Sequence, residues 1–454
     1  MSDIRAWLDD HINLETGVGA PKTGDAAAGM PLVAAPDASD SVSASLGSRS
    51  LDRMRRLLAL LGSPERDFRA IHVAGTTGKT STTRMLTELL RGAGLSVGTY
   101  TSPHLQAVEE RIAYDGQPIE SVELDGALEL IRAIEPDLPE PPSFFEIITA
   151  AAFREFADFA VDVAVVEVGL GGAWDATNLV ASELVTVTNI SVDHTEYFGE
   201  TVAEIARSEA EVVEPDAPLV LGVRDPVLAE PFLTHGAAPV LRRGAHFDAR
   251  DTRLAHGGRV ATLLSPREVY PDVFIALHGA HQADNAALAL ASAETFLAAA
   301  LPDDVVREAF ARVTSPGRLE PVAHQPLVLL DGAHNVAGCE ALRDALQDDF
   351  PESQRVWVLG FLREKDPAEM LTALGIGAND AVVVCRPPSP RALDPEVVAA
   401  AVRALPNPPR VVLVEPRVEA AIDKARDGAP EDGQIVVTGS LYLVGAARSY
   451  LVPA

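Results

Sequence analysis

The chain has 454 residues, which is too long for one ordinary domain and suits two or three. Its formal net charge is −29, so the surface as a whole repels nucleic acid and anionic lipid. No apolar run reaches the roughly 18 to 20 residues that span a membrane, and the acidic N-terminus is unlike a signal peptide. Its two cysteines form no ligand cluster and no disulfide framework. We therefore expect a cytoplasmic protein with neither nucleic-acid nor membrane partners.

The first two thirds of the chain alternate short apolar strands with helix-like stretches. Residues 16–48 are rich in Gly, Ala, Ser, Asp and Pro, which predicts a loop or mobile segment. Helices are expected at 51–61 and 80–91. Buried strands are expected at 70–74, 97–100, 161–168 and 184–190. This alternation is typical of an α/β fold with a doubly wound parallel sheet.

Near residue 316 the alternating pattern starts again. Strands are predicted at 327–330, 356–359, 381–384, 411–414 and 435–438, with helices such as 395–405 and 418–426 between them. We expect a second, smaller Rossmann-like α/β domain. The predicted division is an N-terminal segment over 1–50, a central domain over 51–313 and a C-terminal domain over 314–454.

A phosphate-binding loop lies between the first predicted strand and its helix. It comprises Gly75, Thr76, Thr77, Gly78, Lys79 and Thr80. Glycines let backbone N–H groups turn toward phosphate oxygens, the lysine reaches the β- and γ-phosphates, and the hydroxyl serves the magnesium ion. Ala74 stands where the strict spacing has glycine, a shortened variant of the motif. An ordinary Gly-Thr turn is the weaker alternative, because Lys79 is one of only four lysines.

From about residue 51 to 451 the chain resembles the Mur-ligase superfamily, and within it the folylpolyglutamate synthase / dihydrofolate synthase family. Each motif alone is weak, but their shared order and spacing are specific. The motifs are IHVAGTTGKTST, GTYTSPHL, ERI, FFEIITAAAF, VDVAVVEVGLGGAWDATN, SVDHTEYFGETVAEIA, HQADNAALAL, SPGRLE, LLDGAHN and VTGSLYLVG.

The resemblance implies roles for further residues. Ser102, Glu167 and His194 match magnesium ligands of the family, each at or just beyond the C-terminal end of a predicted strand. Asn285 matches a residue that contacts the adenine. From the second domain, Arg318 and Asp331 match nucleotide contacts, and His334 matches the histidine beside the phosphates. Ser440 and Tyr442 are expected to pack or position the C-terminal motif rather than to act in catalysis.

Three positions depart from the family pattern. Thr77 replaces the usual asparagine, and Ala173 stands where an arginine is frequent. Glu209 replaces the lysine whose carbamate helps to hold a second magnesium ion. Glutamate supplies the same charge, but its carboxyl group reaches roughly 3–4 Å less far from the backbone. Direct replacement would therefore need a backbone shift, a bridging water or help from Glu211, and the alternative is a solvated surface acid.

The resemblance implies an ATP-dependent ligase that joins a carboxylate to an amine through an acyl-phosphate. The substrates would be a folate or dihydropteroate and glutamate, the cofactors ATP and Mg²⁺, and the enzyme a monomer. Lys79, Arg318 and His334 are the candidate catalytic residues. Two alternatives stay open at this point, namely a Mur-like amide ligase for another acyl substrate and a nucleotide-binding paralogue without turnover.

Overall fold

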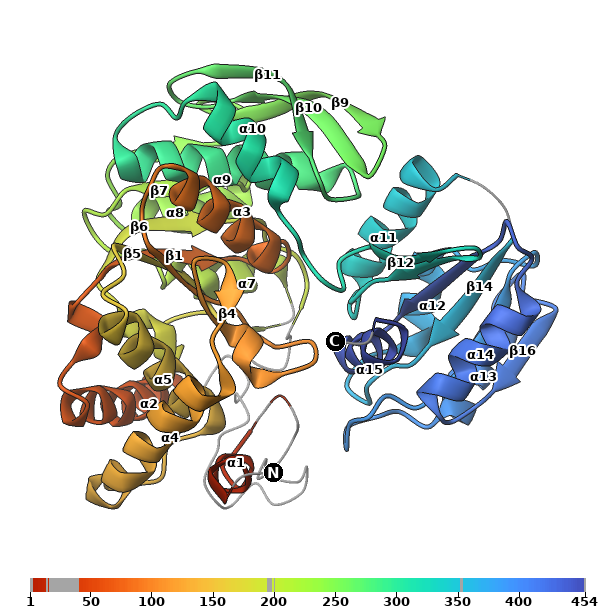
Figure 1. Cartoon of the computed structure of the whole chain (residues 1–454), viewed down its shortest axis with the longest axis horizontal. Coiled ribbons are helices and arrows are strands. Elements are labelled where there is room, and N and C mark those ends of the chain that lie inside the picture. The colour runs from red at the N-terminus through yellow and green to blue at the C-terminus, as the bar shows by residue number, and fades with distance from the viewer. Residues whose placement is uncertain are drawn as a thin grey trace.

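Three β-sheets organise the structure, a computed structural model that describes residues 3–13, 15, 41–193, 198–199, 201–351 and 354–452. One lobe holds two of the sheets, and the C-terminal lobe, blue in Figure 1, holds the third. Among the helices in the ranges just given, none combines the length and the apolar character that crossing a bilayer requires.

The largest sheet carries the phosphate loop. Its strand order is β4-β3-β2-β5-β1-β6-β7-β8, and six of its strands run parallel. The strands are β1 (Arg69–Ala74), β2 (Val97–Tyr100), β3 (Ile112–Tyr114), β4 (Gln117–Pro118), β5 (Val163–Glu167), β6 (Ser182–Val187), β7 (Leu219–Leu221) and β8 (Val240–Arg242). The doubly wound parallel architecture is thus confirmed, with β3 and β4 added antiparallel at one edge.

Both faces of this sheet are covered, as a buried parallel sheet requires. Alternate residues of β1 face opposite sides, so Ile71 and Val73 join one core and Ala70 joins the other. The first core includes α3 (Lys79–Gly92), α9 (His281–Leu297) and α10 (Asp303–Arg312). The second includes α1 (Asp3–Asp9), α2 (Ser41–Leu60), α4 (Ser121–Ile134) and α5 (Phe144–Asp158). The helices α7 (Val202–Ala210) and α8 (Pro226–Thr234) cover the end near β6 and β7.

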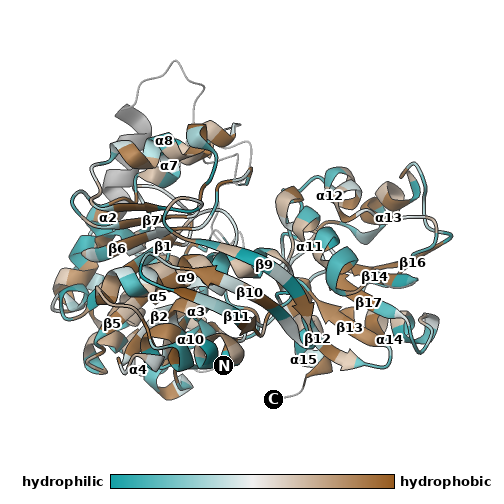
Figure 2. Ribbon diagram, turned by 90° about the horizontal axis from the view of Figure 1, so that it is seen from above, coloured by the Kyte–Doolittle hydropathy of each residue, from teal (hydrophilic) through white to brown (hydrophobic). Residues whose placement is uncertain are grey.

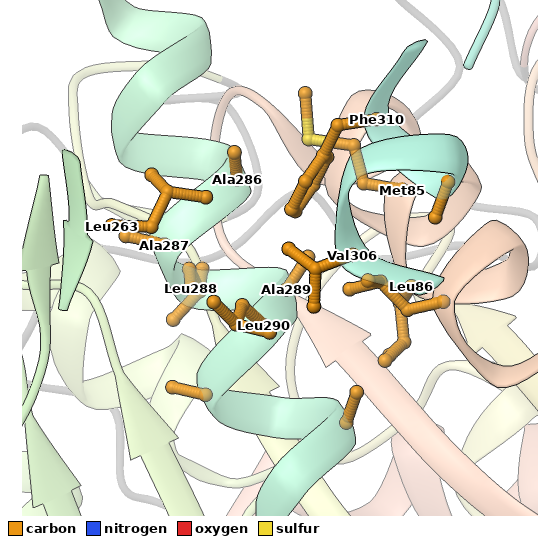
Figure 3. Close-up of a cluster of buried hydrophobic side chains, with 14 of the residues drawn as sticks. Met85, Leu86, Leu263, Ala286, Ala287, Leu288, Ala289, Leu290, Val306 and Phe310 are labelled. Carbon is orange, nitrogen blue, oxygen red and sulfur yellow. The ribbon is translucent and has the colours of Figure 1, made fainter. Parts of the chain in front are cut away.

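An antiparallel sheet that the sequence analysis did not predict packs on α9. It comprises β9 (Asp248–Ala255), β10 (Gly258–Leu264) and β11 (Val269–Ile275). Figure 3 shows the alanine-rich stretch of α9 between Leu263 of this sheet and Met85, Val306 and Phe310 of the neighbouring helices. Small side chains allow the elements to approach closely, and this core holds α3 and α9 in fixed relation beneath the phosphate loop.

The C-terminal lobe is a second α/β unit. Its sheet has the order β12-β13-β17-β14-β15-β16, parallel except for β12. The strands are β12 (Glu320–His324), β13 (Leu327–Leu330), β14 (Arg355–Leu359), β15 (Ala381–Val384), β16 (Val411–Val414) and β17 (Gln434–Thr438). The helices are α11 (Val336–Asp349), α12 (Pro367–Leu374), α13 (Pro395–Arg403), α14 (Val418–Gly428) and α15 (Leu441–Leu451). Figure 2 shows hydrophobic strands inside both lobes, as the apolar runs predicted.

The N-terminal region differs from its prediction. The loop expected over 16–48 is wrong for residues 41–48, which belong to α2. The stretch from 41 to 46 contains neither Gly nor Pro and continues into the predicted helix, so nothing in it stops the helix earlier. Residues 16–40 lie outside the described residues. The sequence analysis did not predict α1, whose Ile4 and Leu8 are buried against the first lobe. The division at 1–50, 51–313 and 314–454 stays a proposal.

Candidate active site

The phosphate loop joins the end of β1 to the start of α3, at the carboxyl edge of the large sheet. Gly75 has φ 118°, and a Cβ there would lie 2.2 Å from Thr188 Oγ1. Gly78 has φ 80° and is the N-cap residue of α3. A side chain at either position would meet both backbone strain and a neighbour. The loop therefore brings its backbone to the N-terminus of α3, where helix geometry favours an anion.

Residues that follow β6 hold the loop from one side. The Thr76 amide donates to Asn189 O at 2.8 Å, and the Thr77 amide donates to Asn189 Oδ1 at 3.0 Å. The Thr188 hydroxyl donates to Thr77 O at 2.7 Å. Thr77 therefore fits its position, because its hydroxyl also hydrogen-bonds the Asn189 amide group. The sequence analysis did not single out Thr188 or Asn189, whose role depends on the neighbouring strand.

The Lys79 side chain folds back over the loop that it follows. Its Nζ donates to Gly75 O at 2.7 Å and to Thr76 O at 3.3 Å. Burial raises the pKa of Glu167 and of Glu209, and the same ammonium group is near enough to both to oppose that rise. Lys79 thus places a positive charge inside the loop and between two carboxylates, where the phosphates of a nucleotide need it.

Glu167 ends β5 and is only 1% exposed. Its Oε1 accepts a hydrogen bond from Thr80 Oγ1 at 2.9 Å, whereas Oε2 finds no hydrogen-bond partner among the described residues. Burial raises the pKa of Glu167, and Lys79, Thr80 and the Ser102 backbone oppose that shift. Ser102 is itself buried nearby. A buried carboxylate oxygen that lacks a partner, next to hydroxyl groups, suits a hard cation such as Mg²⁺.

The metal site is only partly visible. His194, the third predicted ligand, lies outside the described residues. Within the described ranges no three His, Cys, Asp or Glu side chains converge as a metal-binding group. The described part of the site therefore offers Glu167 with the Thr80 hydroxyl on its Oε1, and Ser102, whose backbone lies beside the same carboxylate. Oxygen donors of this kind fit magnesium, which usually keeps several waters.

Glu209 on α7 lines the same pocket as Gly75, Lys79 and Gly171. It is 5% exposed, and its Oε2 has no hydrogen-bond partner among the described residues. Burial raises the pKa of Glu209, and Lys79 and the Gly75 backbone oppose that shift. The alternative of a solvated surface acid is therefore wrong. Its predicted part in holding a second metal ion stays a prediction.

A buried polar chain supports the glycine-rich loop that follows β5. The amides of Gly169 and Leu170 donate to Asp175 Oδ2 at 3.1 and 2.8 Å. The Thr177 hydroxyl donates to Asp175, and His72 Nε2 hydrogen-bonds Thr177 Oγ1 at 2.8 Å. Burial lowers the pKa of His72 to about 4, so this ring is neutral at pH 7. Ala173, at the position where arginine is frequent, is exposed.

Arg318 and Asp331 come from the second lobe and approach the first. Burial raises the pKa of Glu167 and of Asp331, and the Arg318 guanidinium opposes that rise, at Glu167 across the lobe boundary and at Asp331 within its own lobe. Asp331 accepts the Leu319 and Ala333 amides, each at 2.8 Å. Asp331 thus ties together the two loops that carry Arg318 and His334. The geometry gives it an architectural part beside the predicted nucleotide contact.

His334 is oriented by its own backbone. Its Nδ1 donates to Gly332 O at 2.8 Å, which leaves Nε2 facing Asp193 Oδ2 at 3.9 Å. Burial lowers the pKa of His334, while Asp193 opposes that shift. The sequence analysis missed Asp193 as a site residue, and it also missed Asn335 and Lys365, which hydrogen-bond Asp193 at 2.6 and 2.8 Å. The scarcity of lysine was the signal that could have selected Lys365.

Asn285 lies in the first turns of α9, against the phosphate loop. Its Nδ2 donates to Gln282 Oε1 at 3.0 Å, and a Cβ at Gly78 would lie 2.8 Å from Asn285 Oδ1. The structure thus brings Asn285 to the loop together with Ser102, Glu167, Glu209, Arg318 and His334. The predicted contact between Asn285 and adenine stays a prediction.

Comparison with known proteins matches both lobes. The profile of the Mur ligase middle domain covers residues 73–293, and that of the Mur ligase, glutamate ligase domain, covers 317–441. The dihydrofolate synthase/folylpolyglutamate synthase of Mycobacterium tuberculosis is 41% identical over an alignment of 440 residues, and the match covers 88% of this chain and 89% of the relative. The folylpolyglutamate synthase of Lacticaseibacillus casei is 33% identical over 88% of this chain and 94% of the relative.

Solved structures agree with these matches. Folylpolyglutamate synthase of M. tuberculosis, complexed with ADP and AMPPCP, has a TM-score of 0.84 and 39% identity over 91% of this chain and 98% of that one. The bifunctional enzyme of Yersinia pestis, complexed with AMPPNP and Mn ion, has a TM-score of 0.77 and 28% identity over 88% and 93%. These neighbours are consistent with the use of ATP and a divalent metal ion. The chain therefore belongs to the folylpolyglutamate synthase / dihydrofolate synthase family of Mur ligases, and it is an ATP-dependent ligase.

Proposed function

We propose that the chain couples the amine of glutamate to the carboxylate of a folate or a dihydropteroate, through an acyl-phosphate formed from ATP. One observation carries the proposal. The phosphate loop and its Lys79 face two buried carboxylates, Glu167 and Glu209, each with an oxygen that finds no partner among the described residues. Such a pocket suits a nucleotide phosphate bound together with a cation. The names of the relatives support the choice of acid and amine.

In the first half of the reaction, a substrate carboxylate oxygen attacks the γ-phosphorus of ATP and ADP departs. The loop amides and Lys79 hold the phosphates. Magnesium, when bound, would neutralise phosphate charge, and the residues proposed to hold it are Ser102, Glu167, His194 and Glu209. Arg318 adds positive charge from the second lobe, and we assign it to the transferring phosphoryl group.

In the second half, the amine attacks the acyl carbon and phosphate leaves. His334 is the side chain proposed to accept the amine proton. Its Nδ1–H is fixed on Gly332 O, so Nε2 carries the lone pair, and burial lowers its pKa. A neutral imidazole beside the pocket has the protonation state that a general base needs. The pair of steps requires the acyl-phosphate to stay away from water while the lobes are together.

A product assay by mass spectrometry tests the proposal. The protein is incubated with magnesium ATP and glutamate, and with dihydropteroate or tetrahydrofolate in parallel. We expect one glutamyl unit added to at least one acid, with one ADP formed for each bond. ADP formation with another carboxylic acid, but with neither of these two, would favour a Mur-like ligase of different substrate. Nucleotide binding without any product would favour the non-catalytic paralogue.

We further propose that the enzyme acts as a monomer in the cytoplasm. Residues of both lobes of one chain meet at the pocket, and the proposed substrates are small molecules. Light scattering after size-exclusion chromatography gives the mass directly, and cell fractionation gives the compartment. A stable dimer at micromolar concentration would contradict the first part.

A further inference from the structure

The Asp193 carboxylate of the first lobe lies against three polar side chains of the second lobe. Lys365 Nζ donates to Asp193 Oδ1 at 2.8 Å, and Asn335 Nδ2 donates to Asp193 Oδ2 at 2.6 Å. His334 Nε2 lies 3.9 Å from the same Oδ2. The side chains of Asp193 and Lys365 are only 6% and 18% exposed. This ion pair therefore lies largely out of water, where charge interactions are stronger than at a surface.

Asp193 also lines the phosphate pocket. Lys79 and Glu209 line the same pocket, and Glu167 is close enough to Lys79 for the ammonium group to oppose the rise in pKa that burial causes there. The pocket thus has three carboxylates around one loop lysine. Metal ions can balance Glu167 and Glu209, but a third negative charge beside a nucleotide phosphate is repulsive unless something neutralises it. Lys365 is the described cation that contacts Asp193 directly.

Lys365 is presented by a fixed turn of the second lobe. The turn follows β14 at the carboxyl edge of its sheet, where its amide donates to Leu362 O at 3.2 Å. The neighbouring Arg363 amide donates to Arg391 O at 2.9 Å. Asp193 follows β6 in the other lobe. The pair can therefore form only while the two lobes are apposed.

We infer that Lys365 is a positioning residue that makes the charge of the phosphate pocket depend on lobe closure. With the lobes together, Lys365 neutralises the Asp193 carboxylate and Asn335 orients it, so the pocket retains bound nucleotide. When the lobes part, this carboxylate loses the contacts with Lys365 and Asn335, and its charge then repels the phosphates more strongly, which favours release of ADP. The inference rests on the proposed function only in requiring that the pocket bind a nucleotide.

Equilibrium binding of magnesium ADP, measured by calorimetry in a four-variant cycle, tests the inference. Lys365→Met should weaken binding by about tenfold, since it leaves Asp193 charged beside the phosphates. Asp193→Asn should not weaken it. In the Asp193→Asn background, Lys365→Met should change the affinity by less than about twofold, because its target is gone.

Lys424→Met is the matched control. Lys424 lies in the same lobe and pairs with Glu415 at 2.6 Å, but its side chain is 45% exposed. The substitution removes the same charge far from Asp193, so ADP affinity should stay at the parent value. Equal losses for Lys365→Met and Lys424→Met would show only an effect of net charge and would overturn the inference.

Two further outcomes decide the mechanism. If Lys365→Met lowers the ADP affinity as much in the Asp193→Asn background as in the parent, Lys365 contacts the nucleotide itself and the inference is wrong. Lys365→Arg keeps the charge and should restore binding to within about threefold. If Lys365→Met does not fold, Lys365→Arg and the double variant carry the test, and weak binding in either one overturns the inference.

The same experiment separates this inference from the proposed function. ADP binding requires no acyl substrate, so a protein that follows the cycle but forms no glutamyl product refutes the proposed function alone. A parent protein that does not bind ADP overturns both. A protein that forms product but shows additive effects in the cycle overturns the inference alone.

Discussion

The two lobes contribute to the site in different ways. The first supplies six consecutive residues, Gly75 to Thr80, whose positions are set by β1, α3 and the backbone that follows β6. The second supplies Arg318, His334 and Lys365 from three separate loops, and these reach the pocket only across the lobe boundary. The first lobe is therefore built to bind a nucleotide, whereas the second can act only on the assembled site. Substitutions in the first lobe should therefore affect nucleotide binding directly, whereas substitutions in the second lobe should have their effect only when the lobes are together.

The largest effect is expected in the first lobe. Lys79→Ala should lower turnover by about 10³-fold or more, because the transferring phosphate loses a preorganised charge. The fold should survive, since among the described residues the Nζ hydrogen-bonds backbone oxygens of its own loop. Initial rates measure the loss, and circular dichroism checks the fold. A variant with parent activity would remove Lys79 from the mechanism, and a variant without helical signal would show a structural role instead.

In the second lobe, Arg318→Ala should separate rate from binding. We expect turnover to fall by about 10²-fold while the affinity for magnesium ADP changes by less than about threefold. The physical reason is that Arg318 faces Glu167 across the boundary and so acts in the closed state. Lys79→Ala is the comparison, since it should lower both quantities. An equal loss of rate and affinity in Arg318→Ala would erase the difference between the lobes.

At Glu209 we expect an effect on the reaction smaller than at Lys79 or Arg318 and larger than at His72. Glu209→Gln keeps the shape and removes the charge, and it should raise the magnesium concentration for half-maximal rate by about tenfold. The parent should not respond to bicarbonate, because a carboxylate needs no carbon dioxide to carry its charge. Initial rates against magnesium, with and without bicarbonate, measure both points.

The control for Glu209 is its exposed neighbour in the same helix turn. Glu211→Gln removes an equal charge from the surface and should leave the magnesium dependence unchanged. Glu209→Lys with added bicarbonate should recover part of the activity if a longer carbamate can take the place of the glutamate. Coincident magnesium curves for the parent and Glu209→Gln would limit Glu209 to packing.

The sequence could predict the first lobe's site better than the second's, for a physical reason. The phosphate loop is contiguous and lies between a strand and a helix, so residue types and order were enough to identify it. Lys365 and Asp193 are 172 positions apart, and only the packing of the lobes brings them together. The sequence analysis did not predict the strands β9 to β11, because polar and charged residues interrupt their apolar pattern. The stretch DARDTRLA of β9 is an example.

The smallest effect on the reaction is expected behind the first lobe's site, at His72. This ring is fully buried on β1 and hydrogen-bonds Thr177, which holds Asp175 beneath the glycine-rich loop. Burial lowers the pKa of His72 from 6.5 to about 4, so between these pH values the unfolded chain binds a proton that the folded chain does not. The stability that the neutral ring contributes is therefore present above pH 6.5 and is lost as the pH falls toward 4. Between these two pKa values the free energy of unfolding falls by about 1.4 kcal/mol for each pH unit, so the loss should reach about 1.4 kcal/mol near pH 5.5.

His72→Gln should remove this acid sensitivity, since the amide can still donate to Thr177 and does not titrate. Thermal midpoints at pH 7.5 and 5.5 measure it, and the parent should lose more than the variant does. The matched control is His256→Gln, because His256 is exposed. At pH 7.5, turnover of His72→Gln should stay within about threefold of the parent, because the ring touches no proposed substrate. If the thermal midpoint falls equally in the parent and in His72→Gln between pH 7.5 and 5.5, protonation of His72 does not affect stability. The first lobe's site would then depend on its backbone alone.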